Sequence, residues 1–316
     1  MSIVLAFLAA APMPQPIDTP AADPLPAHAP RTIVTFGDEG TRMTVPVTIA
    51  DAGPYRFVVD TGAERTVISR QLAQTLGLPA GRDVRVTAMA DAVVVGTFRI
   101  PSIAVTKAKA IGGKAIEAPA LEEYNLGAPG MLGIDALQKH ALAIDFDKSE
   151  MEVIPSARRR TRDSAPDEIV VRAKSLFGQL VVTDAYYGGT RVKVVIDTGS
   201  AVTMGNPALR AKVERRKHPL RPIALMSVTG TYLNADYTQV RRVKLGQIEM
   251  ADIPVAFADA LPFRKFGLSD KPALMLGMDT LKLFRRVSID FANREIRFVM
   301  PRTAKQDFGD RHSVTR

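Results

Sequence analysis

Residues 57–62 read Phe-Val-Val-Asp-Thr-Gly, and residues 194–199 read Val-Val-Ile-Asp-Thr-Gly. In both stretches an apolar run ends in Asp-Thr-Gly. A short apolar run is typical of a buried strand, and the Thr-Gly that follows it indicates the tight turn that ends the strand. Asp60 and Asp197 are therefore predicted at strand ends, where a carboxylate is costly to bury unless something compensates it. Two such groups in one pattern indicate a functional pair.

The two stretches belong to a longer repeat. Residues 131–137 (MLGIDAL) match residues 275–281 (MLGMDTL), and residues 143–146 (AIDF) match residues 288–291 (SIDF). The offset between the copies is 137 residues at the aspartates, 144 at the glycines of the second block and 145 in the third. One loop insertion of about seven residues reconciles these offsets, so the chain is predicted to consist of two related halves.

A β-hairpin is predicted to deliver each aspartate. In the first half, a strand-like segment at 43–49 is followed by the turn sequence Asp-Ala-Gly-Pro at 51–54 and then by the motif strand. In the second half, a strand-like segment at 179–186 is followed by Gly188-Gly189 and then by the motif strand. Turn residues between two such runs are the usual signal of a hairpin.

The three repeated blocks resemble the aspartic proteases, and specifically two retropepsin-like halves fused in tandem. The resemblance covers roughly residues 35–155 and 170–300. It implies an all-β fold, mainly β with a few short helices, in which two closed-barrel lobes related by a pseudo-two-fold meet at a cleft. Each lobe would supply one catalytic aspartate, here Asp60 and Asp197. The protein would then be a monomer that contains an intramolecular pseudo-dimer.

Two neighbouring carboxylates suit peptide hydrolysis. Both cannot ionise cheaply, so one proton is shared and the pair titrates in two macroscopic steps. The ionised member can act as general base on a bridging water while the protonated member polarises the scissile carbonyl. The predicted activity is therefore that of an aspartic-type endopeptidase with a polypeptide substrate and with neither a metal nor a cofactor.

The resemblance also implies supporting residues around the pair. Thr61 and Thr198 would lock the two active-site loops together by hydrogen bonds, while Gly62 and Gly199 permit the turns and a close approach. Two further glycines, at the ends of the apolar segments of the second block, would pack beside these loops: Gly133 and Gly277.

Acids elsewhere in the repeat are predicted to be structural. Asp135 and Asp279 each follow a packing glycine and begin a short helix, expected over 134–140 in the first half and over 278–284 in the second. Acids of the third block, Asp145 and Asp290, precede a Phe and a turn.

The residues that follow the two tripeptides differ. Ala63-Glu64 follows the first, and by resemblance Glu64 is a possible contact for the substrate main chain. Ser200-Ala201 follows the second, where the resemblance implies that the Ser200 hydroxyl hydrogen-bonds Asp197. Such a donor would lower the pKa of Asp197, which predicts that Asp60 is more often the protonated member.

A flap is expected to cover the cleft from each half. The candidates are residues 87–92, between two strand-like segments, and residues 227–231 in the second half. An ordinary hairpin on each side is the alternative.

Composition excludes several classes of site. The 316 residues include no cysteine, so a disulfide framework and a Cys-ligated metal are impossible, and the four histidines are scattered. The net charge is +9, with the excess in the second half. No nucleic-acid recognition module accompanies it, so a solvated basic face is predicted and no nucleic-acid partner.

The ends and the junction are predicted to lie outside the lobes. Residues 1–34 combine a signal-peptide-like apolar run with a Pro/Ala-rich linker, residues 156–169 form a basic linker, and residues 301–316 form a tail. The apolar run is far below the roughly 18 residues that span a bilayer, so no stable membrane insertion is expected. Export to the periplasm or the medium is predicted, with the cytoplasm as the alternative.

Other activities find little support. The chain has no Gly-x-Ser-x-Gly elbow, no phosphate-binding loop and no His-Glu-x-x-His. The alternative function is a catalytically inactive peptide-binding or structural protein that retains the fold. Because both Asp-Thr-Gly copies are intact, the enzyme is favoured. Pairing of each half with its copy in another chain is disfavoured by the short junction.

Overall fold

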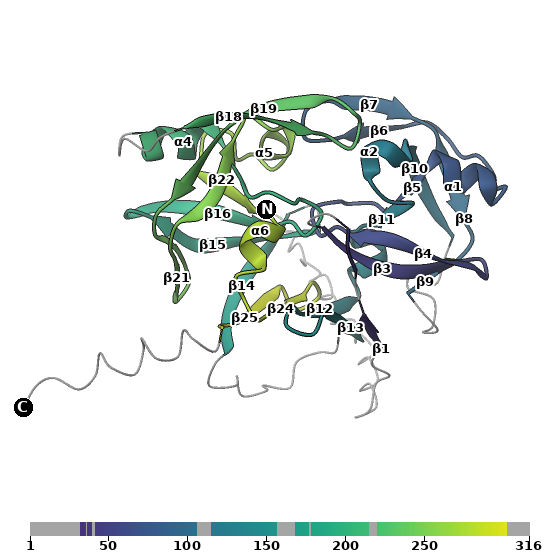
Figure 1. Ribbon diagram of the computed structural model, residues 1–316, viewed down its shortest axis with the longest axis horizontal. Helices are drawn as coiled ribbons and strands as arrows, with labels where there is room; N and C mark the ends of the chain where they lie inside the picture. Colours follow the sequence, from purple (N-terminus) through teal and green to yellow (C-terminus); the bar gives the residue numbers. More distant parts are fainter. Residues whose placement is uncertain are drawn as a thin grey trace, which may run out of the picture.

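The computed structural model of the chain describes residues 32–35, 37–39, 42–105, 115–156, 168–176, 178–214 and 220–301. These residues form a mainly β molecule with short helices, which confirms the predicted fold class. The two halves of the sequence lie on opposite sides of the molecule, the second half on the left of Figure 1 and the first half on the right. The predicted signal-like segment, most of the junction and the tail lie outside the described residues.

The first half contains thirteen of the described strands. They are β1 (Thr32–Thr35), β2 (Gly37–Glu39), β3 (Arg42–Ile49), β4 (Ala52–Val59), β5 (Val67–Ser69), β6 (Val84–Thr87), β7 (Ala92–Val95), β8 (Thr97–Ile100), β9 (Ile103–Val105), β10 (Ile116–Leu121), β11 (Gly130–Leu132), β12 (His140–Asp145) and β13 (Glu150–Pro155). Its helices are α1 (Arg70–Thr75), α2 (Glu123–Leu126) and α3 (Ile134–Leu137).

The second half repeats much of this plan. Its strands are β14 (Glu168–Leu176), β15 (Gln179–Tyr187), β16 (Thr190–Ile196), β17 (Met204–Gly205), β18 (Arg221–Met226), β19 (Tyr232–Val240), β20 (Val243–Leu245), β21 (Ile248–Met250), β22 (Ile253–Phe257), β23 (Ala273–Leu276), β24 (Arg286–Asp290) and β25 (Glu295–Val299). Its helices are α4 (Pro207–Glu214), α5 (Leu261–Lys265) and α6 (Met278–Leu281).

Each motif strand lies between a hairpin partner and a strand of the second repeat block. β4 pairs antiparallel with β3 and parallel with β11, where Val59 lies opposite Leu132. β16 pairs antiparallel with β15 and parallel with β23, where Ile196 lies opposite Leu276. The apolar runs are buried because both faces of the motif strand are covered, as Val58 and Val59 belong to different buried clusters. The equivalent pairings bring both Asp-Thr-Gly turns to the same region.

The predicted hairpins form with turns that suit their sequences. Gly188 and Gly189 both have positive φ, as a two-residue turn between twisted antiparallel strands requires. In the first hairpin the two turn residues are Ala50 and Asp51, both with positive φ, so the turn begins one residue before the predicted segment 51–54. The helices of the second block are shorter than predicted, because α3 and α6 span four residues each and His140 already belongs to β12.

A sheet shared by both halves lies beneath the two lobes in Figure 1. Its strands run in the order β1-β13-β12-β24-β25-β14, so the first three come from the first half and the last three from the second. β12 and β24 are antiparallel neighbours, and Leu142 lies opposite Ile289. Asp145 and Arg286, at the end of this pairing, form an ion pair of 2.6 Å. Asp145 is thus structural in this fold.

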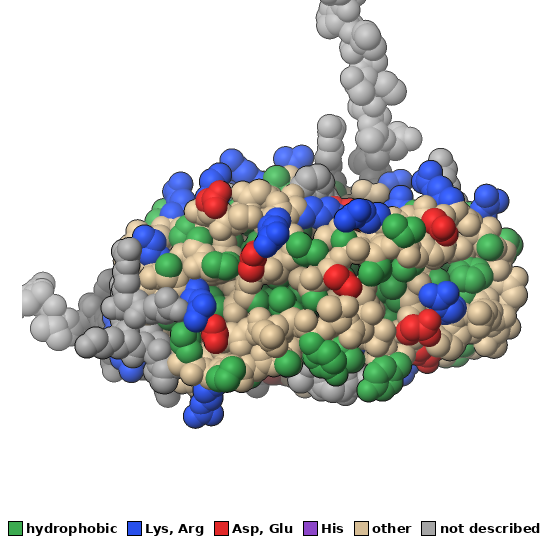
Figure 2. Space-filling model, turned by 90° about the horizontal axis from the view of Figure 1, so that it is seen from above, with side chains coloured by type: hydrophobic (Ala, Val, Ile, Leu, Met, Phe, Trp, Pro, Cys, Tyr) green, Lys and Arg blue, Asp and Glu red, His purple; other side chains and the backbone are tan. Residues whose placement is uncertain are grey.

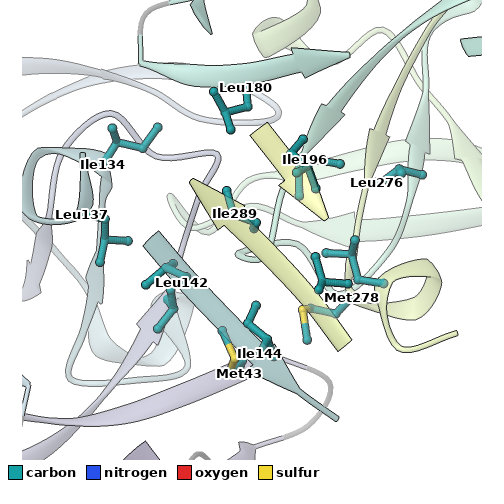
Figure 3. Packing of buried hydrophobic residues seen from close by; sticks show 14 of the residues in the cluster. Met43, Ile134, Leu137, Leu142, Ile144, Leu180, Ile196, Leu276, Met278 and Ile289 are labelled. Carbon is teal, nitrogen blue, oxygen red and sulfur yellow. The ribbon is translucent and has the colours of Figure 1, made fainter. Parts of the chain in front are cut away.

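The buried core continues across this junction. Figure 3 shows Leu142 and Ile144 of β12 beside Ile289 of β24, with apolar side chains of both lobes around them. The labelled neighbours are Met43, Ile134, Leu137, Leu180, Ile196, Leu276 and Met278. One cluster of buried side chains therefore joins the lobes, and it fixes the two aspartate loops relative to each other. No helix of the described residues is long and apolar enough to cross a membrane.

Candidate active site

Asp60 and Asp197 follow β4 and β16 directly, and the same backbone contact fixes each of them. The Asp60 N–H donates to Leu132 O and the Asp197 N–H donates to Leu276 O, both at 2.9 Å. Each aspartate is 8% exposed. The parallel neighbour of each motif strand therefore holds a nearly buried carboxyl group at the end of that strand.

Backbone N–H groups of the following turn point at each carboxylate. The N–H groups of Gly62 and Ala63 donate to Asp60 Oδ1 at 2.8 and 2.9 Å. Those of Gly199 and Ser200 donate to Asp197 Oδ1 at 3.1 and 3.2 Å. These bonds favour the ionised form, and they leave Oδ2 of each aspartate free of the turn.

The two threonines exchange hydrogen bonds between the halves. Thr61 Oγ1 donates to Ile196 O at 2.9 Å, and Thr198 Oγ1 donates to Val59 O at 2.7 Å. Each hydroxyl also accepts the backbone N–H of the other threonine at 3.1 Å. Both side chains are buried, so the four bonds tie the two loops in one fixed arrangement.

Each glycine of the tripeptide lies against the aspartate of the other half. A Cβ on Gly62 would come within 2.7 Å of Asp197 Oδ1, and a Cβ on Gly199 within 2.2 Å of the Asp60 carboxyl carbon. No side chain fits at such distances. The glycines therefore allow the two carboxyl groups to approach each other across the pseudo-two-fold.

The second repeat block supports the loops from behind. A Cβ on Gly133 would meet the backbone of Arg65 at 2.3 Å, and one on Gly277 would meet the backbone of Val202 at 2.6 Å. The acid after each glycine binds the same loop. Asp135 accepts the N–H and the hydroxyl of Thr66 at 2.8 and 2.7 Å.

Asp279 repeats this contact with the N–H and the hydroxyl of Thr203, at 3.0 and 2.6 Å. The remaining acid of the repeat, Asp290, accepts the hydroxyl of Ser156 and the backbone N–H of Asn293. Asp135, Asp279 and Asp290 all make structural contacts away from the paired carboxyl groups.

Burial raises the pKa of both carboxyl groups. For Asp60 the bonds from the turn, the contact with Asp197 and the positive charge of Arg42 oppose that rise. For Asp197 the negative charge of Asp60 adds to the effect of burial, and its pKa lies well above the ordinary value. The pair therefore keeps a proton to higher pH than a free aspartate.

The hydrogen bond expected from the Ser200 hydroxyl to Asp197 is not made. This hydroxyl donates to Val202 O at 2.8 Å, within its own turn. Only the backbone N–H of Ser200 reaches Asp197. Because the hydroxyl gives Asp197 no hydrogen bond, the expected lowering of the Asp197 pKa by Ser200 has no source, and the predicted contact was wrong.

A cleft of about 450 Å³ opens above the two carboxyl groups. Its walls are mainly apolar, with side chains from equivalent places in the two halves. The apolar lining includes Val67, Leu121, Met131, Met204, Phe266 and Met275. Val67 and Met204 are related by the offset of the aspartates, and Met131 and Met275 by that of the second block. The cleft therefore has two similar sides and is centred on the aspartates.

Glu64 lies on one wall of the cleft, where its carboxylate forms an ion pair. Its Oε1 lies 2.8 Å from the Nζ of Lys265, which belongs to α5 in the other half. Both side chains line the cleft. The ion pair fixes the Glu64 carboxylate at the wall.

Two hairpins meet above the cleft, the β6–β7 hairpin and the β18–β19 hairpin (Figure 1). Asp91 at the tip of the first accepts the hydroxyls of Thr229 and Thr231 at the tip of the second, at 2.6 and 2.7 Å. The Leu261 N–H also donates to Met89 O at 3.1 Å. Both predicted flap segments contribute to the cleft lining. On this face, acidic and basic side chains are interspersed (Figure 2).

Sequence reasoning missed two residues close to the aspartates, Arg42 and Gln179. Gln179 lines the cleft and is 1% exposed. The 137-residue offset of the aspartates also relates Arg42 to Gln179, so the repeat contained a signal for this pair. Among the residues that the structure describes, no cluster of His, Asp and Glu has an arrangement that would hold a metal ion.

The sequence matches the family described as aspartyl protease over two regions, residues 45–136 and 183–280. The chain belongs to the aspartyl protease family. Each matched region contains one Asp-Thr-Gly and one second block, as expected for a tandem aspartyl protease of retropepsin type. A comparison with curated proteins gave no match.

Proposed function

We propose that this aspartyl protease family member is an endopeptidase that hydrolyses peptide bonds with a water held between Asp60 and Asp197. The observation that carries the proposal is the meeting of two buried carboxyl groups, one from each half, at the floor of a cleft. Burial raises the pKa of both, so one proton remains on the pair when a free aspartate would already be ionised.

In the proposed reaction the ionised Asp60 removes a proton from the water. The water oxygen forms a bond to the scissile carbonyl carbon, and the carbonyl oxygen, which gains negative charge, takes the hydrogen bond and then the proton of Asp197. The tetrahedral intermediate collapses when the C–N bond breaks. Asp60 passes its proton to the departing amine, and Asp197 recovers the proton of the hydroxyl as the acid product forms.

The substrate class follows from the lining of the cleft. Similar apolar walls on both sides suit an extended polypeptide with apolar side chains near the scissile bond. We propose that Glu64, held by Lys265, contacts the substrate main chain at one wall. We further propose that the protein acts as a monomer, because one chain supplies both aspartates, and that it is exported.

Cleavage of an unfolded protein between acidic and neutral pH tests this function. Asp60→Asn and Asp197→Asn should each reduce kcat/KM by at least about 100-fold, because each removes a proton-transfer group. Asp147→Asn, which alters an exposed acid in a turn, is the matched control and should leave the rate unchanged. Full activity of either Asp60→Asn or Asp197→Asn would exclude a mechanism in which both aspartates take part. Peptide binding by the wild type without cleavage would instead indicate an inactive peptide-binding protein.

A further inference from the structure

Arg42 and Gln179 occupy equivalent places beside the two aspartates. Thr44 lies opposite Val58 in the antiparallel β3–β4 pairing. Continuing this register by two residues places Arg42 opposite Asp60. Val181 lies opposite Val195 in the β15–β16 pairing, and the same continuation of the register places Gln179 opposite Asp197. Residues that face each other in this way carry their side chains on the same side of a sheet.

Arg42 is a cation held near Asp60. Its guanidinium donates to the carbonyl oxygen of Leu126, and its side chain is half-buried. Leu126 belongs to the same buried cluster as Val58, which precedes Asp60 by two residues and therefore lies on the same side of β4. Burial raises the pKa of Asp60, and the positive charge of Arg42, which acts on both aspartates, opposes that rise.

Gln179 supplies no charge at the equivalent place. Its Nε2 donates to Gly62 O at 2.8 Å, in the opposite active-site loop. Its buried Oε1 has no hydrogen-bond partner among the described residues. The side chain gives Asp197 no hydrogen bond, so nothing at this position favours a negative charge on Asp197.

We propose that Arg42 and Gln179 are positioning residues that give the dyad a direction: Arg42 keeps Asp60 as the ionised base, and the neutral Gln179 leaves the proton on Asp197. This inference rests on the proposed endopeptidase function. Other charged groups at the cleft do not distinguish Asp60 from Asp197 in this way. Glu64 and Lys265 pair with each other, and Arg65 and Arg85 are exposed to solvent.

The pH dependence of peptide cleavage tests this direction. Activity falls at low pH when the base Asp60 becomes protonated, so loss of the Arg42 charge should move the acidic limb of kcat/KM to higher pH. We expect a shift of roughly 1 pH unit for Arg42→Gln, the lower end of the range for loss of a nearby opposite charge. Arg42→Lys, which retains the charge, should restore most of the wild-type limb.

Arg56→Gln is the matched control, because it removes a half-buried cation that binds Thr44 in the same hairpin, four residues from Asp60. Its acidic limb should stay at the wild-type pH. Thermal unfolding of each variant measures any general loss of structure, which lowers activity at every pH without moving the limb. An Arg42→Gln limb that coincides with that of the wild type would overturn the proposal.

A second readout needs no catalysis. Carbon-13 NMR titration of the aspartate carboxyl groups, assigned with Asp60→Asn and Asp197→Asn, should show Asp60 ionising at lower pH than Asp197 in the wild type. The swap Arg42→Gln/Gln179→Arg should reverse this order if it folds. Ionisation of Asp197 first in the wild type would overturn the inference. An inactive wild type that keeps the predicted order would contradict the proposed function and leave the assignment intact.

Discussion

At the scale of single residues, Asp60 and Asp197 receive matching contacts from different surroundings. Each accepts two N–H groups from its own turn and lies against the glycine of the other half. The difference is in charge: Arg42 opposes the rise in the pKa of Asp60, while Asp60 itself adds to the rise at Asp197. Two copies of one motif thus have raised pKa values for partly different reasons.

Asp197→Asn should make the folded protein more stable at neutral pH. The pKa of Asp197 is raised in the folded state, so the unfolded chain releases this proton more readily as pH rises, and the folded state loses relative stability. An amide at this position has no proton to release. The melting temperature of the variant should therefore exceed that of the wild type at pH 7, and the difference should vanish below about pH 4.

The matched control for this comparison is Asp147→Asn, whose carboxyl is exposed. Its melting temperature should follow that of the wild type across the same pH range. An Asp197→Asn variant that is less stable than the wild type at pH 7 would contradict the raised pKa as the dominant effect.

At the scale of elements, the two hairpins above the cleft differ in the chemistry of their tips. Asp91 of the β6–β7 hairpin binds both Thr229 and Thr231 of the β18–β19 hairpin. Hydrogen bonds to a charged group contribute about 1.5 to 3 kcal/mol each when well formed, and less where solvent competes. One carboxylate therefore accounts for the side-chain hydrogen bonding between the tips.

Asp91→Ala should loosen both hairpin tips. Loss of two hydrogen bonds to one carboxylate should increase amide hydrogen exchange at residues 227–231 by about tenfold or more. Asp83→Ala, which removes an exposed acid just before β6, should leave that exchange unchanged. Equal exchange in the two variants would mean that the tip contact does not hold the hairpins together.

At the scale of the whole molecule, the sheet between the lobes joins two related halves into one unit. β12 and β24 pair within the chain, and the cluster in Figure 3 buries side chains of both halves against them. The threonine exchange connects the same two halves at the active-site loops. Separation of the lobes would break all of these contacts at once.

A mixture of the Asp60→Asn and Asp197→Asn variants should therefore remain inactive. Complementation would require a lobe of one chain to pair with a lobe of another, and the buried contact between the lobes opposes that exchange. The mixture should show no more activity than the separate variants, and sedimentation should give a mass near 34.2 kDa for each. Recovery of activity in the mixture would indicate that the halves pair between chains.

The sequence alone determined the repeat, because an apolar strand, a tight turn and a packing glycine each need particular residues at particular spacings. Those needs located Asp60 and Asp197, the hairpins that carry them and the all-β fold. Only the tertiary structure decided which charges surround each carboxyl group. The ion pair of Glu64 with Lys265, the binding of two threonines by Asp91 and the places of Arg42 and Gln179 depend on contacts between distant segments. Local spacing does not specify such contacts. The wrong prediction for the Ser200 hydroxyl has a local cause, because this side chain donates to Val202 O two residues on instead of to Asp197.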